Sequence, residues 1–397
     1  MKEKILIYGG TFDPVHKGHT HILKSFKEAI NPDKILVIPT GDPPHKDSPD
    51  LINASHRINM LKLALKEENI DAEISDIEVN SKEKSYTAVT LTKLRAIYPD
   101  AEFYFSMGED MFLTLHKWYK PEIILKEAFI CAAKRSDDAE ERLKKQYENL
   151  KTNFSDFKGE IFNIPYLEAS STEIREGTPD KKRELLSESV FRYIFENSLY
   201  TDTFENKIPN REECLKLIKP LLKEKRYTHS LFVAKKALEL QLKYGNSNKE
   251  KVEAAALLHD IMKDTSIETQ LKIIEYSGII LSDSFLKSPQ VLHQLSGALY
   301  LKNYLKVSSR SIISAVKYHT TGRANMSTTE KIIFVADSTS EERNYENLDI
   351  IKEASEISLD KAIFVNTQCI LKDFASKGLF IVEDTLKTYN YYLAKVE

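Results

Sequence analysis

Residues 5–19 read ILIYGGTFDPVHKGH and join a strand, a glycine turn and a helix start. The apolar residues 5–8 predict a buried strand, and Gly9 and Gly10 let the following backbone come close to a bound phosphate. His16 and His19 stand three residues apart, so both can face one ligand. A glycine turn with solvent-facing histidines is the ordinary alternative. The complete string favours a phosphoryl-transfer site, where positioning and charge stabilisation carry catalysis.

The rest of the first 200 residues alternates between strand and helix patterns. Helical spacing of apolar residues marks 20–29, 55–65 and 87–97. Short apolar runs that end in turns predict strands at 5–8, 35–39, 74–79, 102–105, 128–132 and 160–164. This alternation predicts an α/β fold with a mostly parallel sheet, whose ligands bind beyond the carboxyl ends of the strands.

The pattern changes after residue 200. Residues 201–210, TDTFENKIPN, are polar and contain a proline, as a linker would. Beyond them helical periodicity dominates, at 214–222, 230–244, 249–259, 269–276, 290–305, 311–318, 330–336 and 359–376. We therefore expect an α/β domain over 1–203 and an all-α domain over 207–397.

Composition limits the classes of function. Apolar residues make up 42% and charged residues 29%, and no run of eighteen apolar residues exists to cross a membrane. The net charge of −3 gives no basic surface for nucleic acid. Cys131, Cys214 and Cys369 lie far apart without metal-type spacing, which indicates incidental thiols in a reducing compartment. The sequence thus predicts a cytoplasmic protein with small substrates; a homo-oligomer stays open.

Several further blocks follow the opening string in order. They are PPHK at 43–46, Arg57, SYT at 85–87, GED at 108–110, Trp118, Arg135 and SSTEIR at 170–175. With these blocks, residues of about 3–200 resemble the HxGH nucleotidylyltransferase superfamily, and most closely the bacterial nicotinate-nucleotide adenylyltransferases. The resemblance implies a Rossmann-like fold and adenylyl transfer from ATP, bound with Mg²⁺, to nicotinate mononucleotide. Nicotinamide mononucleotide is the nearest rival substrate.

The resemblance also implies roles for individual residues. His16 and His19 would stabilise charge, and Lys46 and Arg175 would hold the triphosphate. The nucleotide would be bound by Gly9, Gly10, Thr11, Phe12, Gly108, Asp110, Ser171 and Thr172. The pyridine mononucleotide would be bound by Tyr86, Thr87, Trp118 and Arg135. Plainer alternatives are a helix cap for Ser171 and Thr172, core packing for Trp118 and ordinary strand packing for Tyr86 and Thr87.

The second half holds a set of metal-type side chains. Its histidines are His229, His259, His293 and His319, and Asp260 and Asp337 accompany them. A single histidine is usually a core residue, but imidazole and carboxylate together suit divalent transition metals. Four histidines and two aspartates exceed what one four-coordinate metal needs. A bridging Asp260 between two metals would use them all, and two metals activate water and clamp a phosphate oxygen.

These residues lie in the strings RYTHS (226–230), HDIMKD (259–264), LHQ (292–294), YHTTGR (318–323) and VADSTSEER (335–343). Residues of about 211–395 thereby resemble the HD-domain metallophosphohydrolases, specifically the YqeK-type family that splits diadenosine tetraphosphate symmetrically. By position, the resemblance places His229, His259, Asp260 and Asp337 on a first metal, and Asp260, His293 and His319 on a second. Iron is the implied metal. Lys263, as part of the catalytic group, and Arg323 and Arg343 would contact substrate phosphates; solvated charges are the alternative.

The sequence as a whole predicts a bifunctional enzyme, an α/β adenylyltransferase followed by an all-α HD-domain hydrolase. Its expected ligands are ATP, nicotinate mononucleotide and diadenosine tetraphosphate. A rival hypothesis keeps the first activity and makes the HD domain a nucleotide sensor without catalysis. A nucleic-acid phosphohydrolase is disfavoured by the acidic balance of charge.

Overall fold

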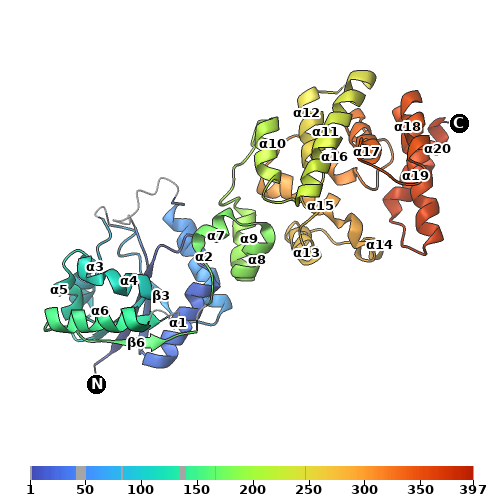
Figure 1. Cartoon of the computed structure of the whole chain (residues 1–397). Helices are drawn as coiled ribbons and strands as arrows, with labels where there is room; N and C mark the ends of the chain where they lie inside the picture. The colour runs from blue at the N-terminus through green and yellow to red at the C-terminus, as the bar shows by residue number, and fades with distance from the viewer. Residues whose placement is uncertain are drawn as a thin grey trace. The chain divides into compact units, whose positions relative to one another are not determined.

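The computed structural model describes residues 2–41, 51–81, 84–134, 140–165, 167–245 and 247–396. The chain forms two compact units (Figure 1). The first comprises Met1–Glu176 with Lys181–Tyr193, and the second comprises Gly177–Asp180 with Ile194–Glu397. Each unit is described on its own.

The first unit is built on one parallel sheet of six strands in the order β3-β2-β1-β4-β5-β6. Its strands are β1 (Lys4–Gly10), β2 (Lys34–Pro39), β3 (Glu73–Ile74), β4 (Glu102–Gly108), β5 (Ala128–Lys134) and β6 (Gly159–Asn163). In register, Tyr8 lies between Val37 and Ser106. The strand order reverses between β1 and β4, and in such sheets a crevice opens at the reversal. The predicted parallel α/β fold is confirmed.

β3 is shorter than the predicted strand at 74–79. Ser75 still donates its N–H to the Val37 carbonyl, at 2.9 Å. The chain then turns, because Asn80 donates its backbone N–H to the Asp76 carbonyl at 3.0 Å and its side-chain amide to the Asp76 carboxylate at 2.7 Å. Such local side-chain bonds compete with a strand ladder.

Helices cover the sheet on both faces (Figure 1). Alternate strand residues such as Ile5 and Ile7 pack in one core with Leu91, Leu94 and Ile124 from the helices of one face. The helices are α1 (Lys17–Ile30), α2 (Ala54–Glu67), α3 (Thr87–Ile97), α4 (Glu109–Thr114), α5 (Pro121–Glu127), α6 (Glu140–Asn153), α7 (Ser171–Glu176), α8 (Pro179–Leu185) and α9 (Glu188–Glu196).

The second unit contains helices alone among its described residues, as predicted. They are α10 (Arg211–Ile218), α11 (Glu224–Tyr244), α12 (Lys249–Leu258), α13 (Ile267–Tyr276), α14 (Asp283–Leu286), α15 (Leu292–Leu299), α16 (Arg310–Tyr318), α17 (Thr328–Thr339), α18 (Leu348–Ile357), α19 (Leu359–Ser376) and α20 (Glu383–Val396). α11, α12, α16 and α17 pack against one another and form its centre. In the described parts of the chain, no helix has the length and apolar character needed to cross a bilayer.

Residues 194–204 pack with the helical unit, so the two units divide earlier than the expected break at 203–207. The Phe195 ring stacks on Tyr304 with centroids 5.7 Å apart. Phe204 is buried and donates its N–H to the Leu305 carbonyl at 2.8 Å. Phe195 and Phe204 therefore anchor this segment to the helical unit. The mostly polar composition around Phe204 made the segment look like a linker.

Candidate active sites

A cleft of about 1310 Å³ opens at the carboxyl ends of β1 and β4, where the strand order reverses. Chain segments distant in sequence line it, among them the loop after β1, the start of α3, the residues from the end of β4 to Tyr119 and the start of α7. From the predicted site it collects Gly9, Gly10, Thr11, Phe12, His16, His19, Tyr86, Thr87, Gly108, Asp110, Trp118, Ser171, Thr172 and Arg175. Lys46 and Arg135, also predicted for this site, lie outside the described residues.

Side chains from distant segments hold the loop between β1 and α1 by its carbonyl oxygens. The buried Arg57 donates one guanidinium nitrogen to the carbonyls of Thr11 and Thr40, each at 2.8 Å. Ser171 donates its hydroxyl to the Pro14 carbonyl at 2.9 Å. Arg175 donates to the Asp13 carbonyl at 2.6 Å, and its other terminal nitrogen donates to Thr172 Oγ1 at 3.0 Å. These contacts form a clamp that fixes the loop against the cleft.

His16 and His19 lie side by side at the start of α1, with ring centroids 3.7 Å apart. Phe12 packs edge-on against His19 at 5.1 Å and has a left-handed backbone, with φ of 52°. Gly10 makes room for that ring, because a Cβ at Gly10 would approach Phe12 to 2.9 Å. At Gly18 a Cβ would lie 3.0 Å from the His16 ring. The glycines of the motif therefore allow its two histidines to pack together.

The opposite wall of the cleft is aromatic. Tyr86 precedes the first residue of α3, and its ring centroid lies 4.5 Å from that of Tyr119. Trp118 is half-buried, lines the cleft and also packs against the apolar core, so both of its expected roles have a basis. Thr87 begins α3, and a helix N-terminus attracts anionic groups. This wall can stack a flat ring and hold a carboxylate at its edge.

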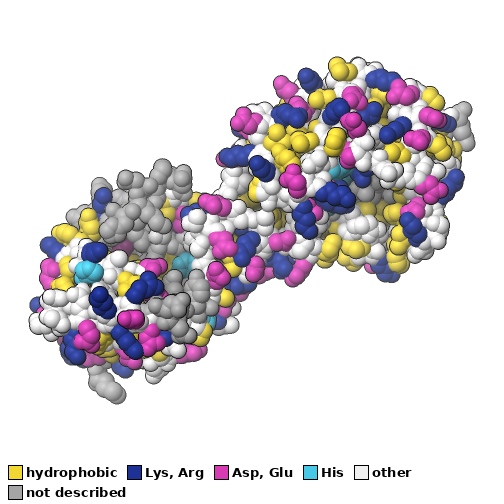
Figure 2. Space-filling model, viewed as in Figure 1, with side chains coloured by type: hydrophobic (Ala, Val, Ile, Leu, Met, Phe, Trp, Pro, Cys, Tyr) yellow, Lys and Arg dark blue, Asp and Glu magenta, His cyan; other side chains and the backbone are white. Residues whose placement is uncertain are grey.

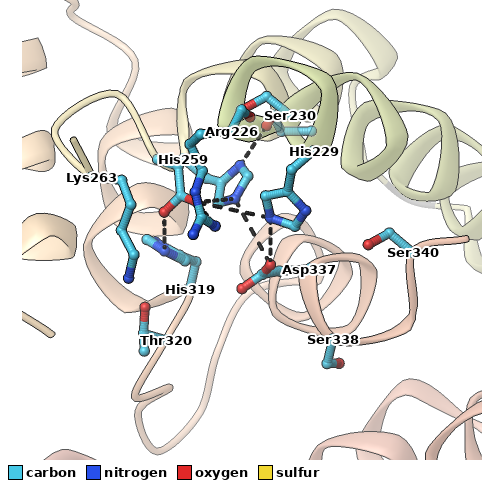
Figure 3. Close-up of polar contacts among 12 residues, drawn as sticks. Arg226, His229, Ser230, His259, Lys263, His319, Thr320, Asp337, Ser338 and Ser340 are labelled. Atoms are coloured by element: carbon cyan, nitrogen blue, oxygen red, sulfur yellow. Dashed lines mark hydrogen bonds and ion pairs between the residues drawn. The ribbon is translucent and has the colours of Figure 1, made fainter. Parts of the chain in front are cut away.

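The second site lies in the helical unit, where the side chains of His229, His259, His319 and Asp337 point toward one another (Figure 3). Asp260 Oδ2 lies 3.4 Å from His259 Nε2 and 3.8 Å from His229 Nε2. Its other oxygen, Oδ1, lies 3.2 Å from His293 Nε2 and 3.5 Å from His319 Nε2. Each carboxylate oxygen thus faces its own pair of imidazoles, so Asp260 could contribute a ligand atom to each of two metal ions.

Asp337 completes the first of these two groups. Its Oδ1 lies 3.0 Å from His229 Nε2 and 3.9 Å from His259 Nε2. His229, His259 and Asp337 present ligand atoms within 4.8 Å of one another, as do His259, Asp260 and His319. The structure therefore brings together all six side chains predicted as metal ligands.

The imidazoles of His229, His259 and His319 are oriented for metal binding. The Nδ1 atoms of His259 and His319 each lie 2.7 Å from a backbone carbonyl, so Nδ1 donates and Nε2 keeps its lone pair. In the His229 ring, Nδ1 donates to the Glu342 carboxylate at 2.5 Å, so its Nε2 also keeps the lone pair. His259 Nε2 is completely buried and has no hydrogen-bond partner among the described residues. A buried orphan nitrogen beside two carboxylates fits a metal ligand.

The local electrostatics agree with this chemistry. Burial opposes the charge on Asp260 and Asp337, but neighbouring histidines and Arg343 outweigh it and hold both pKa values well below the usual range. Burial lowers the pKa of His293 to about 4. Carboxylates that stay ionised and an imidazole that stays neutral are the forms that bind metal. Burial opposes the charged form of His259, but Asp260 and Asp337 outweigh it and raise its pKa, so the two carboxylates favour a positive charge at Nε2, which a metal ion can supply in place of a proton.

Cationic side chains surround the cluster. Lys263 Nζ lies 3.3 Å from His293 Nδ1, and Arg343 donates to Asp337 Oδ1. In Figure 2 a histidine shows on the surface of the helical unit beside dark-blue Lys and Arg side chains. Arg323 does not share this geometry: its guanidinium pairs with the buried Glu330, at 2.7 and 2.8 Å. Of the three expected phosphate contacts, two therefore adjoin the cluster.

Two further residues lie at the cluster and are not among the predicted site residues. Arg226 donates to Asp260 Oδ2 at 2.8 Å, and Glu342 orients His229. Arg226 is three residues before His229 on α11, and that spacing, which places both on one helix face, is a signal that could have found it. Nothing in the sequence singles out Glu342 from its neighbour Glu341, which pairs instead with Lys235.

Together the two sites define a class of protein: an α/β unit with paired HxGH histidines in a cleft, followed by a helical unit with a cluster of histidines and aspartates that could hold metal ions. The Cytidylyltransferase-like family model matches residues 7–177, and the HD domain model matches residues 226–342. A probable nicotinate-nucleotide adenylyltransferase from Clostridium tetani is 36% identical over 203 residues, which are 50% of this chain and 100% of that protein.

One relative extends across both units. The Mycoplasma genitalium protein named probable nicotinate-nucleotide adenylyltransferase/Ap4A hydrolase is 30% identical over 350 residues, which are 87% of this chain and 90% of that protein. A solved structure of a predicted HD superfamily hydrolase involved in NAD metabolism, from Clostridium acetobutylicum, is 32% identical with a TM-score of 0.45; the match covers 46% of this chain and 97% of that one. The chain belongs to the bacterial family that joins a nicotinate-nucleotide adenylyltransferase domain to an HD domain.

Proposed function

We propose that the first unit transfers the adenylyl group of ATP to nicotinate mononucleotide, giving nicotinate adenine dinucleotide and pyrophosphate in NAD biosynthesis. One observation carries this proposal: motif residues from distant parts of the chain line a single cleft at the strand-order reversal. The names of the Clostridium tetani and Mycoplasma genitalium relatives support the same activity.

In this reaction a phosphate oxygen of the mononucleotide attacks the α-phosphorus of ATP, and the bond to pyrophosphate breaks. His16 and His19 would donate hydrogen bonds to the oxygens whose charge grows in the transition state. Arg175 would hold the leaving phosphates, because it lies on the cleft wall. Lys46 is proposed to assist it. Mg²⁺ bound with ATP would neutralise part of the phosphate charge.

For the second substrate, the aromatic wall suggests how the pyridine ring is bound. Trp118 would stack on the ring, and Thr87 at the start of α3 would receive the carboxylate. A carboxylate gains more from a helix N-terminus than a neutral amide does. We therefore favour nicotinate mononucleotide over nicotinamide mononucleotide.

We further propose that the helical unit hydrolyses diadenosine tetraphosphate and water to two ADP. The two-sided arrangement around Asp260 supports two divalent metals, which His229, His259, Asp260 and Asp337 would hold on one side, and Asp260, His293 and His319 on the other. Iron is our first choice among metals that this donor set accepts. The metals would activate water and polarise the phosphate. Lys263, Arg226 and Arg343 would bind phosphate oxygens.

The rival hypothesis, a sensor without catalysis, needs neither a complete ligand set nor the fixed imidazole tautomers. Product analysis of the purified chain tests both activities. With ATP and each mononucleotide in turn, we expect nicotinate adenine dinucleotide to form fastest, with one pyrophosphate per dinucleotide. With diadenosine tetraphosphate and iron, manganese, cobalt or zinc, we expect ADP alone. Equal rates with both mononucleotides would refute the substrate choice, and binding without hydrolysis would favour the sensor.

A further inference from the structure

Glu78 lies on the wall of the nucleotide cleft, in the turn after β3, close to the Tyr86–Thr87 pair. Two hydroxyl groups favour its charged form. Thr90 Oγ1 donates to Glu78 Oε1 at 2.7 Å. Burial raises the pKa of Glu78, and the Thr90 and Ser85 hydroxyls oppose that rise. Ser85 directly precedes Tyr86, and Thr90 lies one helical turn after it. The residues that interact with Glu78 therefore lie on both sides of the Tyr86–Thr87 pair.

The direction of these hydrogen bonds can be assigned. Ser85 Oγ accepts the N–H of Gly41 at 3.1 Å, so its single proton is free to point at Glu78. The Thr90 hydroxyl donates to Glu78, with the Tyr86 carbonyl as a longer alternative at 3.3 Å. Glu78 thus acts as an acceptor toward the hydroxyls beside it. A carboxamide in its place would keep one acceptor oxygen and put an NH₂ donor where the other oxygen stood.

Tight packing supports the same arrangement. A Cβ at Gly41 would lie 2.2 Å from the Glu78 carbonyl oxygen, a distance that no side chain can adopt. Gly41 follows the end of β2, so glycine allows the turn that carries Glu78 to lie directly against this segment. The end of β2, the turn after β3 and the start of α3 therefore meet at Glu78.

We propose that Glu78 is a positioning residue for the pyridine end of the mononucleotide. By holding Ser85 and Thr90 it fixes the start of α3, which sets the Tyr86 ring against Tyr119 and the Thr87 hydroxyl on the cleft wall. Glu78 acts through these neighbours and does not itself touch the reacting phosphates. The inference rests on the proposed use of nicotinate mononucleotide by this cleft.

The test is Glu78→Gln, which keeps the size of the side chain and replaces one acceptor by a donor. We expect the KM for nicotinate mononucleotide to rise about tenfold, as for loss of one hydrogen bond to a charged group. The KM for ATP and the melting temperature should stay close to those of the unmodified protein. The exposed Glu122→Gln on α5 is the matched control and should change neither KM.

A double-mutant cycle separates positioning from general stability. In a Ser85→Ala/Thr90→Val background, Glu78→Gln should have almost no further effect on the mononucleotide KM, because the groups it holds are gone. Equal rises in both KM values, or a full effect in that background, would overturn the inference. So would an unchanged mononucleotide KM in an enzyme that is otherwise active. If the unmodified protein uses neither mononucleotide, the proposed function itself fails, which the unmodified control reveals first.

Discussion

The His19 ring is held between two neighbours, the edge-on Phe12 and the adjacent His16. A ring fixed in this way can stabilise charge without reorganising during the reaction. We expect His19→Ala to lower kcat for adenylyl transfer by roughly 10²–10³, the usual cost of one such donor. His21→Ala on the same helix is the control, because that ring bonds to the Pro165 carbonyl at 2.7 Å. Steady-state rates within about threefold of each other would remove His19 from the mechanism.

Trp118 lines the cleft and also packs against the apolar core, so its substitution can separate a role in substrate binding from a role in stability. Ring stacking is worth about 1–3 kcal/mol by alanine substitution, so Trp118→Ala should raise the mononucleotide KM about tenfold and leave the ATP KM nearly unchanged. Initial-rate kinetics with each substrate varied in turn measure this ratio. A variant that loses thermal stability while both KM values hold would show Trp118 to be a core residue.

The two carboxylate oxygens of Asp260 face different histidines: Oδ2 faces His259, and Oδ1 faces His293 and His319. His259 approaches only Oδ2 of Asp260. We expect Asp260→Ala to remove nearly all bound metal and all hydrolysis, and His259→Ala to retain more metal. Adenylyl transfer should continue in both variants. Elemental analysis of the purified chains should give about two metals in the unmodified protein. A count of one that His293→Ala leaves unchanged would argue against the second metal position.

At the scale of elements, the start of α17 depends on an ion pair. Glu330 is 2% exposed, caps this helix together with Ser327, and pairs with Arg323. Arg323→Ala should therefore lower the free energy of unfolding by about 2 kcal/mol, since it leaves a buried carboxylate with one partner fewer. Urea unfolding measures this, with the exposed Arg310→Ala as control. A stable variant with impaired hydrolysis would instead restore Arg323 as a phosphate contact.

Long elements with regular periodicity could be predicted closely; the range expected for α3, 87–97, matches its observed bounds. Shorter elements depend on contacts that a sequence does not display. β3 ends at Ile74, and beyond it the chain forms a turn in which the side chain of Asn80 bonds back to Asp76. Site residues follow the same rule. Those in compact motifs could be predicted from the sequence. Glu342 and Glu78 could not, because their partners His229 and Thr90 come close to them only in the folded chain.

At the scale of the whole molecule, the two units have separate cores and should function separately. A fragment of residues 1–203 should keep adenylyl transfer, and a fragment that starts at residue 188 should keep hydrolysis. A fragment that starts at residue 207 loses Phe195 and Phe204, which are buried in the helical unit. It should unfold with about 3 kcal/mol less free energy than the longer fragment. Equal melting curves for the two would place the boundary at 203–207 after all.

The clamp on the loop after β1 has a consequence for how this protein is made. Its carbonyl oxygens are near the beginning of the chain, but Ser171 and Arg175, which hold two of them, come more than 150 residues later. Ribosomes add about 5–20 residues each second, and domains begin to fold as they emerge. The glycine turn therefore waits several seconds for the side chains that fix it. Throughout that interval the nascent chain carries the motif without the side chains that fix it, so we expect a message broken before the Arg175 codon to yield a product without adenylyl transfer.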